Sequence, residues 1–124
     1  MGRVTKVNWI TEALIKSSPN KVFLFGDNLA RRGLKGQASV MRGWQNCIGI
    51  PTKKYPTMHP NAFFTDDEYQ QNCWAIDEAF SRIPEDVEVV IPEAGLGTGL
   101  AQLPSRAPRT YAYLLERLAA LESS

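Results

Sequence analysis

Three short apolar runs, each followed by a glycine-rich or helical segment, constrain the fold of this chain most strongly. The runs lie at 22–25, 47–50 and 87–91 and consist mainly of valine, isoleucine and phenylalanine. Short runs of this composition are typical of strands buried on both faces of a sheet. Strands that alternate with helices predict a mainly parallel sheet that is covered on both faces. We therefore predict a compact α/β protein with three layers, in which helices lie on each side of the sheet.

The expected helices are marked by apolar residues at spacings of three and four. We expect Thr65 and Glu68 to form a capping box at the start of the longest stripe, and Pro84 to end it. That stripe consists of Tyr69, Cys73, Ile76, Phe80 and Ile83.

Shorter helices are expected at 9–16, capped by Asn8, and at 37–43. Pro51 is expected to end the second strand. A final helix is expected to begin near Ser105. Its predicted buried face consists of Tyr111, Leu114, Leu115, Leu118 and Leu121.

The composition is that of an ordinary globular protein with one domain, which we expect to span 1–124. A formal net charge of +1 gives no bulk attraction to nucleic acid or to an anionic membrane. The sequence has no apolar stretch of about 18 residues, so no membrane partner is expected and a cytoplasmic location is the default. Cys47 and Cys73 lack metal-ligand spacing and are expected to be reduced core thiols, whereas His59 is expected in a surface loop. Neither a metal nor a cofactor is predicted.

Two glycine-bearing loops, at 26–38 and 92–101, follow the first and the third apolar run. Loops at the carboxyl ends of strands are where open α/β sheets bind ligands. Glycine permits close approach and positive φ, so that backbone N–H groups can point at phosphate oxygens. The two loops therefore predict a pocket for a nucleotide that contains a diphosphate, provided that their strands are neighbours in the sheet.

The first loop leads into a short helix whose free N–H groups suit an anion. Its spacing matches neither a Walker A motif nor a strict dinucleotide fingerprint. Asp27 is interpreted either as a turn former or as a contact to a ribose or base, and Lys53 either as a phosphate contact or as a solvated residue. The predicted binding residues are Gly26, Asp27, Asn28, Gly33, Gly36, Gln37, Thr52, Gly95, Leu96, Gly97, Thr98, Gly99 and Leu100.

These motifs resemble those of the macrodomain family, and the order of the expected elements over about residues 20–121 is similar as well. The motifs that carry the resemblance are Gly33-x-Lys35-Gly36-x-Ala38 and, after Ile91-Pro92, Gly95-x-Gly97-x-Gly99-Leu100. The first loop looks like the branch that includes glycohydrolases removing ADP-ribose from nucleic acid or from acidic side chains. The resemblance implies that the chain binds ADP-ribose, with Asn28 at the distal ribose and 97–99 around the diphosphate.

The resemblance also implies hydrolysis of ADP-ribosyl linkages on nucleic acid or protein, with Lys35 and Asn28 as the candidate catalytic residues. A lysine that only orients phosphate is the alternative, and the protein is then a non-catalytic binder or sequestering protein. Ala101 stands where some relatives carry a catalytic aspartate. The aspartate with which many macrodomains recognise adenine has no secure match either, although Asp27 is near. Enzymatic activity is therefore left open.

Overall fold

The computed structural model describes residues 3–34 and 36–123. Among these residues, four strands form one sheet in the order β1-β4-β2-β3. Each strand runs parallel to its neighbour. This confirms the predicted α/β architecture with a parallel sheet. The strands are β1 (Val4–Val7), β2 (Val22–Asn28), β3 (Cys47–Lys53) and β4 (Val89–Pro92).

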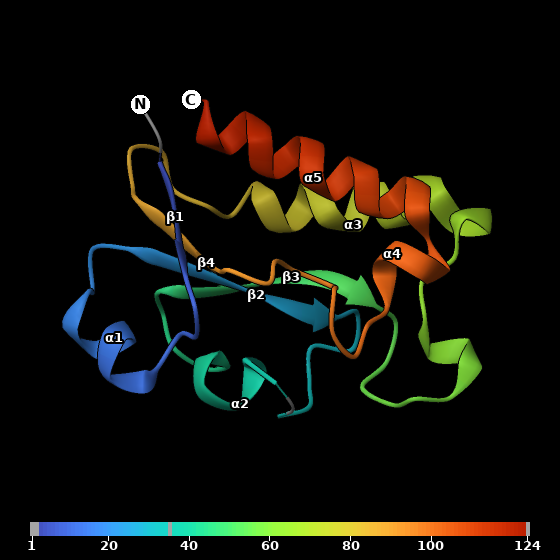
Figure 1. Cartoon of the computed structure of the whole chain (residues 1–124), viewed down its shortest axis with the longest axis horizontal. Helices are drawn as coiled ribbons and strands as arrows, with labels where there is room; N and C mark the ends of the chain where they lie inside the picture. Colours follow the sequence, from blue (N-terminus) through green and yellow to red (C-terminus); the bar gives the residue numbers. More distant parts are fainter. Residues whose placement is uncertain (1–2, 35, 124) are drawn as a thin grey trace.

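Helices cover both faces of the sheet, as predicted. Figure 1 shows α1 and α2 on one side of the strands, with α3 and α5 on the other. The described helices are α1 (Glu12–Ser17), α2 (Ala38–Met41), α3 (Tyr69–Phe80), α4 (Leu103–Arg106) and α5 (Pro108–Glu122), together with the 3-10 turns Pro60–Ala62 and Asp66–Glu68. In the part of the chain that the structure describes, no helix combines the length and apolar character needed to span a membrane.

The residues of β2 alternate between the two faces of the sheet. Leu24 packs against α3 and α5, whereas Phe23 and Phe25 pack against α1 and α2. All three side chains are buried. A strand that contributes to an apolar cluster on each face needs a continuous apolar run, which explains why the pattern at 22–25 does not alternate.

The strand bounds differ from the sequence prediction: β2 continues to Asn28, through residues that were expected in the first loop, and β1 and β3 differ most. The edge strand β1 was not predicted, because it is short and its central residues, Thr5 and Lys6, are polar and exposed. The strand β3 continues through Pro51, which was expected to end it. Because β3 lies at the other edge of the sheet, a proline there removes no hydrogen bond that a central strand would need.

The helix boundaries also differ, and α2 is shorter than expected at Ala38–Met41. The first helix begins at Glu12 instead of 9, and its cap is Thr11, whose hydroxyl accepts from the N–H of Leu14 at 3.1 Å. The expected capping box is absent, because Thr65 makes no side-chain cap hydrogen bond. The final helix, α5, begins at 108, and the short α4 occupies the position expected for its first turn.

The expected helix faces are confirmed in large part. Ile76 and Phe80 of α3 and Leu114 of α5 are buried, but Leu115 is 47% exposed and was wrongly placed in the core. The α3 helix ends at Phe80, before the proline that was expected to stop it.

Both cysteines are free and half-buried. Burial raises the pKa of the Cys47 thiol to about 11, so this thiol stays protonated and unreactive near neutral pH. His59 lies exposed in the loop before the first 3-10 turn, as expected.

Candidate functional site

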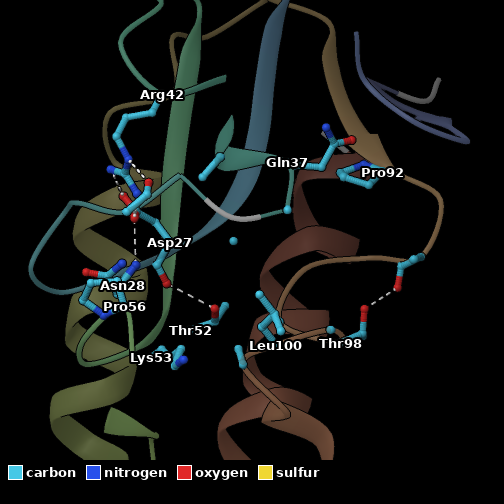
Figure 2. Close-up of a pocket in the computed structure, with 18 of the residues that line it drawn as sticks. Asp27, Asn28, Gln37, Arg42, Thr52, Lys53, Pro56, Pro92, Thr98 and Leu100 are labelled. Carbon is cyan, nitrogen blue, oxygen red and sulfur yellow. Dashed lines mark hydrogen bonds and ion pairs between the residues drawn. The ribbon is translucent and has the colours of Figure 1, made fainter. Parts of the chain in front are cut away.

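A pocket of about 410 Å³ lies at the carboxyl ends of β2 and β4 (Figure 2). Both glycine loops line it, together with the end of β3 and the chain that follows β3. The loops come very close to each other, since a Cβ added to Gly26 would lie 3.4 Å from the backbone nitrogen of Gly97. The structure therefore brings together the two loops that the sequence analysis expected to converge.

The topology of the sheet opens this pocket. The neighbouring strands β2 and β4 pair only near their starts, at Val22–Val89 and Phe23–Val90. The chain leaves β2 toward α2 on one face of the sheet and leaves β4 toward α4 and α5 on the other (Figure 1). Adjacent strands whose connections diverge in this way leave a crevice at their carboxyl ends, which is where α/β sheets bind ligands.

The second loop offers unpaired backbone donors to this crevice. Gly97 has a φ of 77°, and a Cβ there would approach both Leu103 and Thr52 to 3.1 Å, so only glycine fits. The N–H groups of Gly97, Thr98 and Gly99 donate no hydrogen bond to another described residue. Successive free amides of this kind form a concavity that suits an anion.

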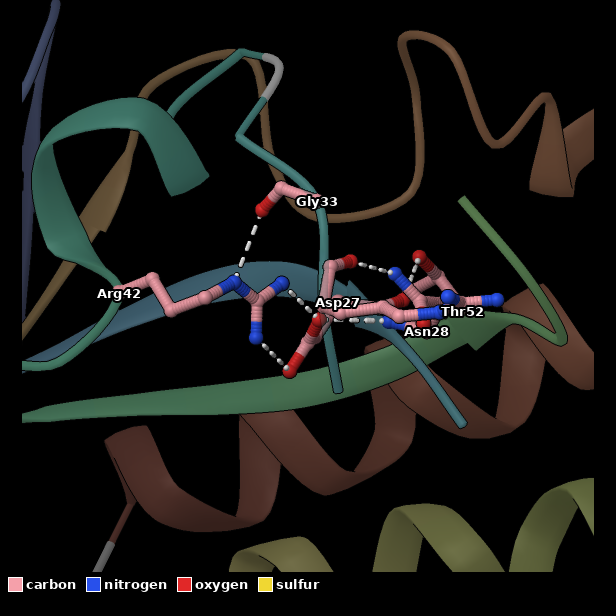
Figure 3. Close-up of polar contacts among 6 residues, drawn as sticks. Asp27, Asn28, Gly33, Arg42 and Thr52 are labelled. Atoms are coloured by element: carbon pink, nitrogen blue, oxygen red, sulfur yellow. Dashed lines mark hydrogen bonds and ion pairs between the residues drawn. The ribbon is translucent and has the colours of Figure 1, made fainter. Parts of the chain in front are cut away.

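An ion pair fixes the shape of the first loop (Figure 3). Both terminal nitrogens of Arg42 donate to the carboxylate of Asp27, and its Nε donates to the carbonyl of Gly33 at 2.8 Å. The same carboxylate accepts from the N–H of Asn28 at 2.8 Å. A Cβ on Gly49 of β3 would collide with this carboxylate, so the position beside the Asp27 side chain requires glycine. These contacts support the interpretation of Asp27 as a turn former instead of a ligand contact.

Asn28 carries a buried acceptor without a partner. Its Nδ2 donates to the carbonyl of Arg32 at 2.7 Å, and this contact fixes the orientation of the amide. Its Oδ1 is buried and makes no hydrogen bond within the described part of the chain. Buried polar atoms without partners are rare, and each calls for a specific explanation. Asn28 therefore remains a candidate for binding a donor group of a ligand.

Gln37 and Thr52 line the pocket, but their polar groups hold the protein together. The Gln37 Oε1 accepts from the N–H of Ile10 at 2.7 Å, and its Nε2 donates to the carbonyl of Ile10 at 2.9 Å. The Thr52 hydroxyl donates to the carbonyl of Asp27 at 3.2 Å. Both side chains therefore position the walls of the pocket.

Several other predicted residues are placed as follows. Leu96 is 2% exposed, packs in the apolar cluster beneath α3 and α5, and is not among the residues that line the pocket. Lys53 is buried, and its Nζ donates to the carbonyl of Thr57. The candidate catalytic residue Lys35 lies outside the described residues. The remaining predicted residues, Gly33, Gly36, Gly95, Thr98, Gly99 and Leu100, line the pocket.

The sequence analysis expected an anion at the start of α2, but this helix has only four residues. A helix dipole grows with the number of aligned peptide units, so it contributes little here. The candidate anion contacts are the free amides of the second loop and the side chain of Arg32, which is exposed, lines the pocket and makes no ion pair with a described residue.

The apolar side of the pocket was missed from the sequence. It includes Trp9, Leu34 and Met58, large side chains that are exposed to solvent at the pocket. Trp9 was expected to begin a helix, but because α1 begins at Glu12 it lies in the connection between β1 and α1. An exposed tryptophan at a concave site is a signal that only coordinates can give, because its exposure is invisible in the sequence.

Charged groups in the pocket are few. Among its lining residues that the structure describes, Asp27 has the one carboxylate, and that carboxylate is bound to Arg42. The described residues contain no group of three or more histidine, cysteine, aspartate or glutamate side chains placed to hold a metal ion.

Comparison with known proteins shows a family. The model of the Family of unknown function (DUF7831) matches residues 5–117, a range that includes the pocket and most of the chain. No curated protein and no solved structure matches the chain.

Proposed function

The chain belongs to the Family of unknown function (DUF7831), and we propose that it binds ADP-ribose or a related diphosphate nucleotide in the pocket between its two glycine loops. The observation that carries this proposal is the run of free amides at Gly97, Thr98 and Gly99, in a crevice that a second glycine loop closes. Free backbone donors in a concave site favour a ligand with several acceptor oxygens, as in a diphosphate.

Other features of the pocket agree with such a ligand. Its volume of about 410 Å³ lies within the usual range for small-molecule sites. The unpartnered Oδ1 of Asn28 would accept from a ribose hydroxyl, and the guanidinium of Arg32 would offset part of the diphosphate charge. This arrangement supports a relationship to the macrodomain family, in which the corresponding loops surround ADP-ribose.

The charges of the pocket favour binding over hydrolysis. The carboxylate of Asp27 is engaged by Arg42, and Ala101 offers no acid–base group. Hydrolysis of an ADP-ribosyl linkage would then depend on Lys35. We propose to test this with ADP-ribosylated DNA and protein as substrates. Release of ADP-ribose by the wild type but not by Lys35→Ala would establish an enzyme that uses Lys35. Binding of ADP-ribose without release from either substrate would establish a binder.

The binding proposal is tested with a substitution at Gly99. A Cβ there meets no atom within 4 Å, and its φ is not in the left-handed region, so the fold tolerates a side chain. We expect Gly99→Glu to occupy the pocket and to repel a diphosphate, weakening ADP-ribose binding by at least about tenfold, or about 1.4 kcal/mol. Isothermal titration calorimetry measures this change.

Ala112→Glu is the matched control, because Ala112 is exposed on α5 and does not line the pocket. It adds the same charge and should leave the affinity unchanged. Circular dichroism would verify that both variants fold. Absence of ADP-ribose binding by the wild type, or equal affinity in Gly99→Glu, would rule out this pocket as a nucleotide site.

A further inference from the structure

Trp9 borders the pocket in an unusual state. Its side chain is 52% exposed, although tryptophan buries more apolar surface than any other residue when it is packed. It follows β1, whose last residue, Val7, pairs with Pro92 of β4. Trp9 therefore lies at the end of the pocket formed by β1 and β4, whereas Asn28 lies at the end formed by β2 and β3.

The segment that carries Trp9 is held in place by Gln37. The side-chain amide of Gln37 pairs with both the N–H and the carbonyl of Ile10, and the Ile10 side chain is fully buried. Figure 2 shows Gln37 beside Pro92 at this end of the pocket. Ile10, the residue next to Trp9, is therefore held by two hydrogen bonds and by its buried side chain, and these contacts fix the backbone that carries the exposed indole.

Among the described residues that line the pocket, none has a carboxylate that is free to accept a hydrogen bond from a base. Both oxygens of Asp27 accept hydrogen bonds from Arg42, and the side chain is 8% exposed. The polar side chain next to Trp9 is Asn8, which also lines the pocket. An amide offers a donor and an acceptor, so it can pair with either an amino or a keto group on a purine.

We propose that the base of the bound nucleotide stacks on Trp9, and that the protein requires a base but does not select adenine. This inference rests on the proposed function. Stacking on an aromatic side chain is tolerant of base identity, because every base presents a π-face. Selection of adenine would instead need a fixed acceptor for its amino group, such as a free carboxylate.

The first experiment compares Trp9→Ala with Trp74→Ala. Trp74 is 71% exposed but lies on α3 and does not line this pocket, so it is a control for loss of an exposed indole. We expect Trp9→Ala to bind ADP-ribose about tenfold more weakly, a loss typical of one base–aromatic stack. Trp9→Phe should recover part of the affinity, and Trp74→Ala should bind as the wild type does.

The second experiment reads stacking directly. In a Trp44→Phe, Trp74→Phe variant, Trp9 is the remaining indole. We expect ADP-ribose to quench its fluorescence in proportion to binding, an effect that a purely structural role of Trp9 would not produce. The hypoxanthine analogue of ADP-ribose, with a keto group in place of the amino group, should bind within about threefold of ADP-ribose, since stacking does not depend on that group.

The outcomes separate the two proposals. If the wild type does not bind ADP-ribose, the proposed function itself fails. If the wild type binds and Trp9→Ala binds equally well, or no quenching accompanies binding, the stacking role is overturned while the pocket stands. If ADP-ribose bound more than about tenfold more tightly than its hypoxanthine analogue, the inference that the protein does not select adenine would be wrong.

Discussion

The carboxylate of Asp27 and the guanidinium of Arg42 are both largely buried beneath the pocket. A buried charge without its partner is costly, because it has lost its hydration and gained nothing in return. Here the pair also sets the path of the first loop, since the same arginine holds the carbonyl of Gly33. Sequence reasoning left Asp27 open between turn formation and ligand binding, because its partner lies 15 residues away along the chain.

We predict that Arg42→Ala lowers the free energy of unfolding by about 3 kcal/mol, because it leaves the carboxylate of Asp27 buried and unpaired. Arg31→Ala is the matched control. It removes an exposed ion pair with Glu78 and should cost less than about 1 kcal/mol. Urea denaturation of the three proteins gives the comparison. If both variants lost a similar free energy of unfolding, the ion pair between Asp27 and Arg42 would not act as a buried structural pair.

At the scale of elements, the start of α5 is capped by a residue that is distant in the sequence. Its N-cap residue makes no side-chain hydrogen bond. Instead Asp66, in the 3-10 turn before α3, caps it by accepting from the N–H groups of Arg109 and Thr110 at 2.9 and 3.0 Å. The Thr110 hydroxyl donates to the same carboxylate and accepts from Asn72 of α3. The sequence analysis interpreted the polar segment 65–68 as a cap for α3, the helix that follows it. The local pattern could not show that Asp66 caps α5.

Asp66 gives a prediction for pH dependence. Burial acts to raise the pKa of its carboxyl, but the hydrogen bonds from Arg109 and Thr110 outweigh it and lower the pKa. A lowered pKa in the folded state means that the contribution to stability is present above the unfolded pKa of about 3.9 and is lost as the pH falls through the folded value. We expect Asp66→Ala to cost about 1 kcal/mol at pH 7 and less at pH 3.

Asp67→Ala is the control, since Asp67 is exposed in the same turn and makes no hydrogen bond or ion pair with a described residue. Urea denaturation at the two pH values measures both variants. An equal cost of Asp66→Ala at pH 7 and pH 3 would contradict an ionised cap.

At the scale of the whole molecule, the pocket depends on the order of the strands. Its walls come from connections that leave the sheet toward opposite faces, so a ligand seated there would bridge the two layers of helices. A ligand that binds the folded state alone stabilises it by mass action.

We therefore predict that ADP-ribose at about 100 times its dissociation constant stabilises the fold by about 2.7 kcal/mol. Thermal unfolding followed by circular dichroism should show a midpoint raised by several degrees for the wild type. At the same ADP-ribose concentration Gly99→Glu, which is expected to bind at least about tenfold more weakly, should be stabilised by at most about 1.4 kcal/mol. An equal shift in this variant would place the binding elsewhere on the molecule.

The sequence alone determined the layers of this protein, because continuous apolar runs and helical stripes report burial on two faces or on one. It also located both glycine loops, since positive φ and close approach at Gly97 restrict the residue type locally. Only the tertiary structure decided which strands are neighbours and which partner each polar or aromatic side chain meets. Pairing of β2 with β4 brought the loops together, Arg42 and Ile10 engaged the side chains of Asp27 and Gln37, and Trp9 was left exposed at the pocket. These outcomes depend on partners distant along the chain, and a local pattern carries no information about which partner a polar or aromatic group will meet.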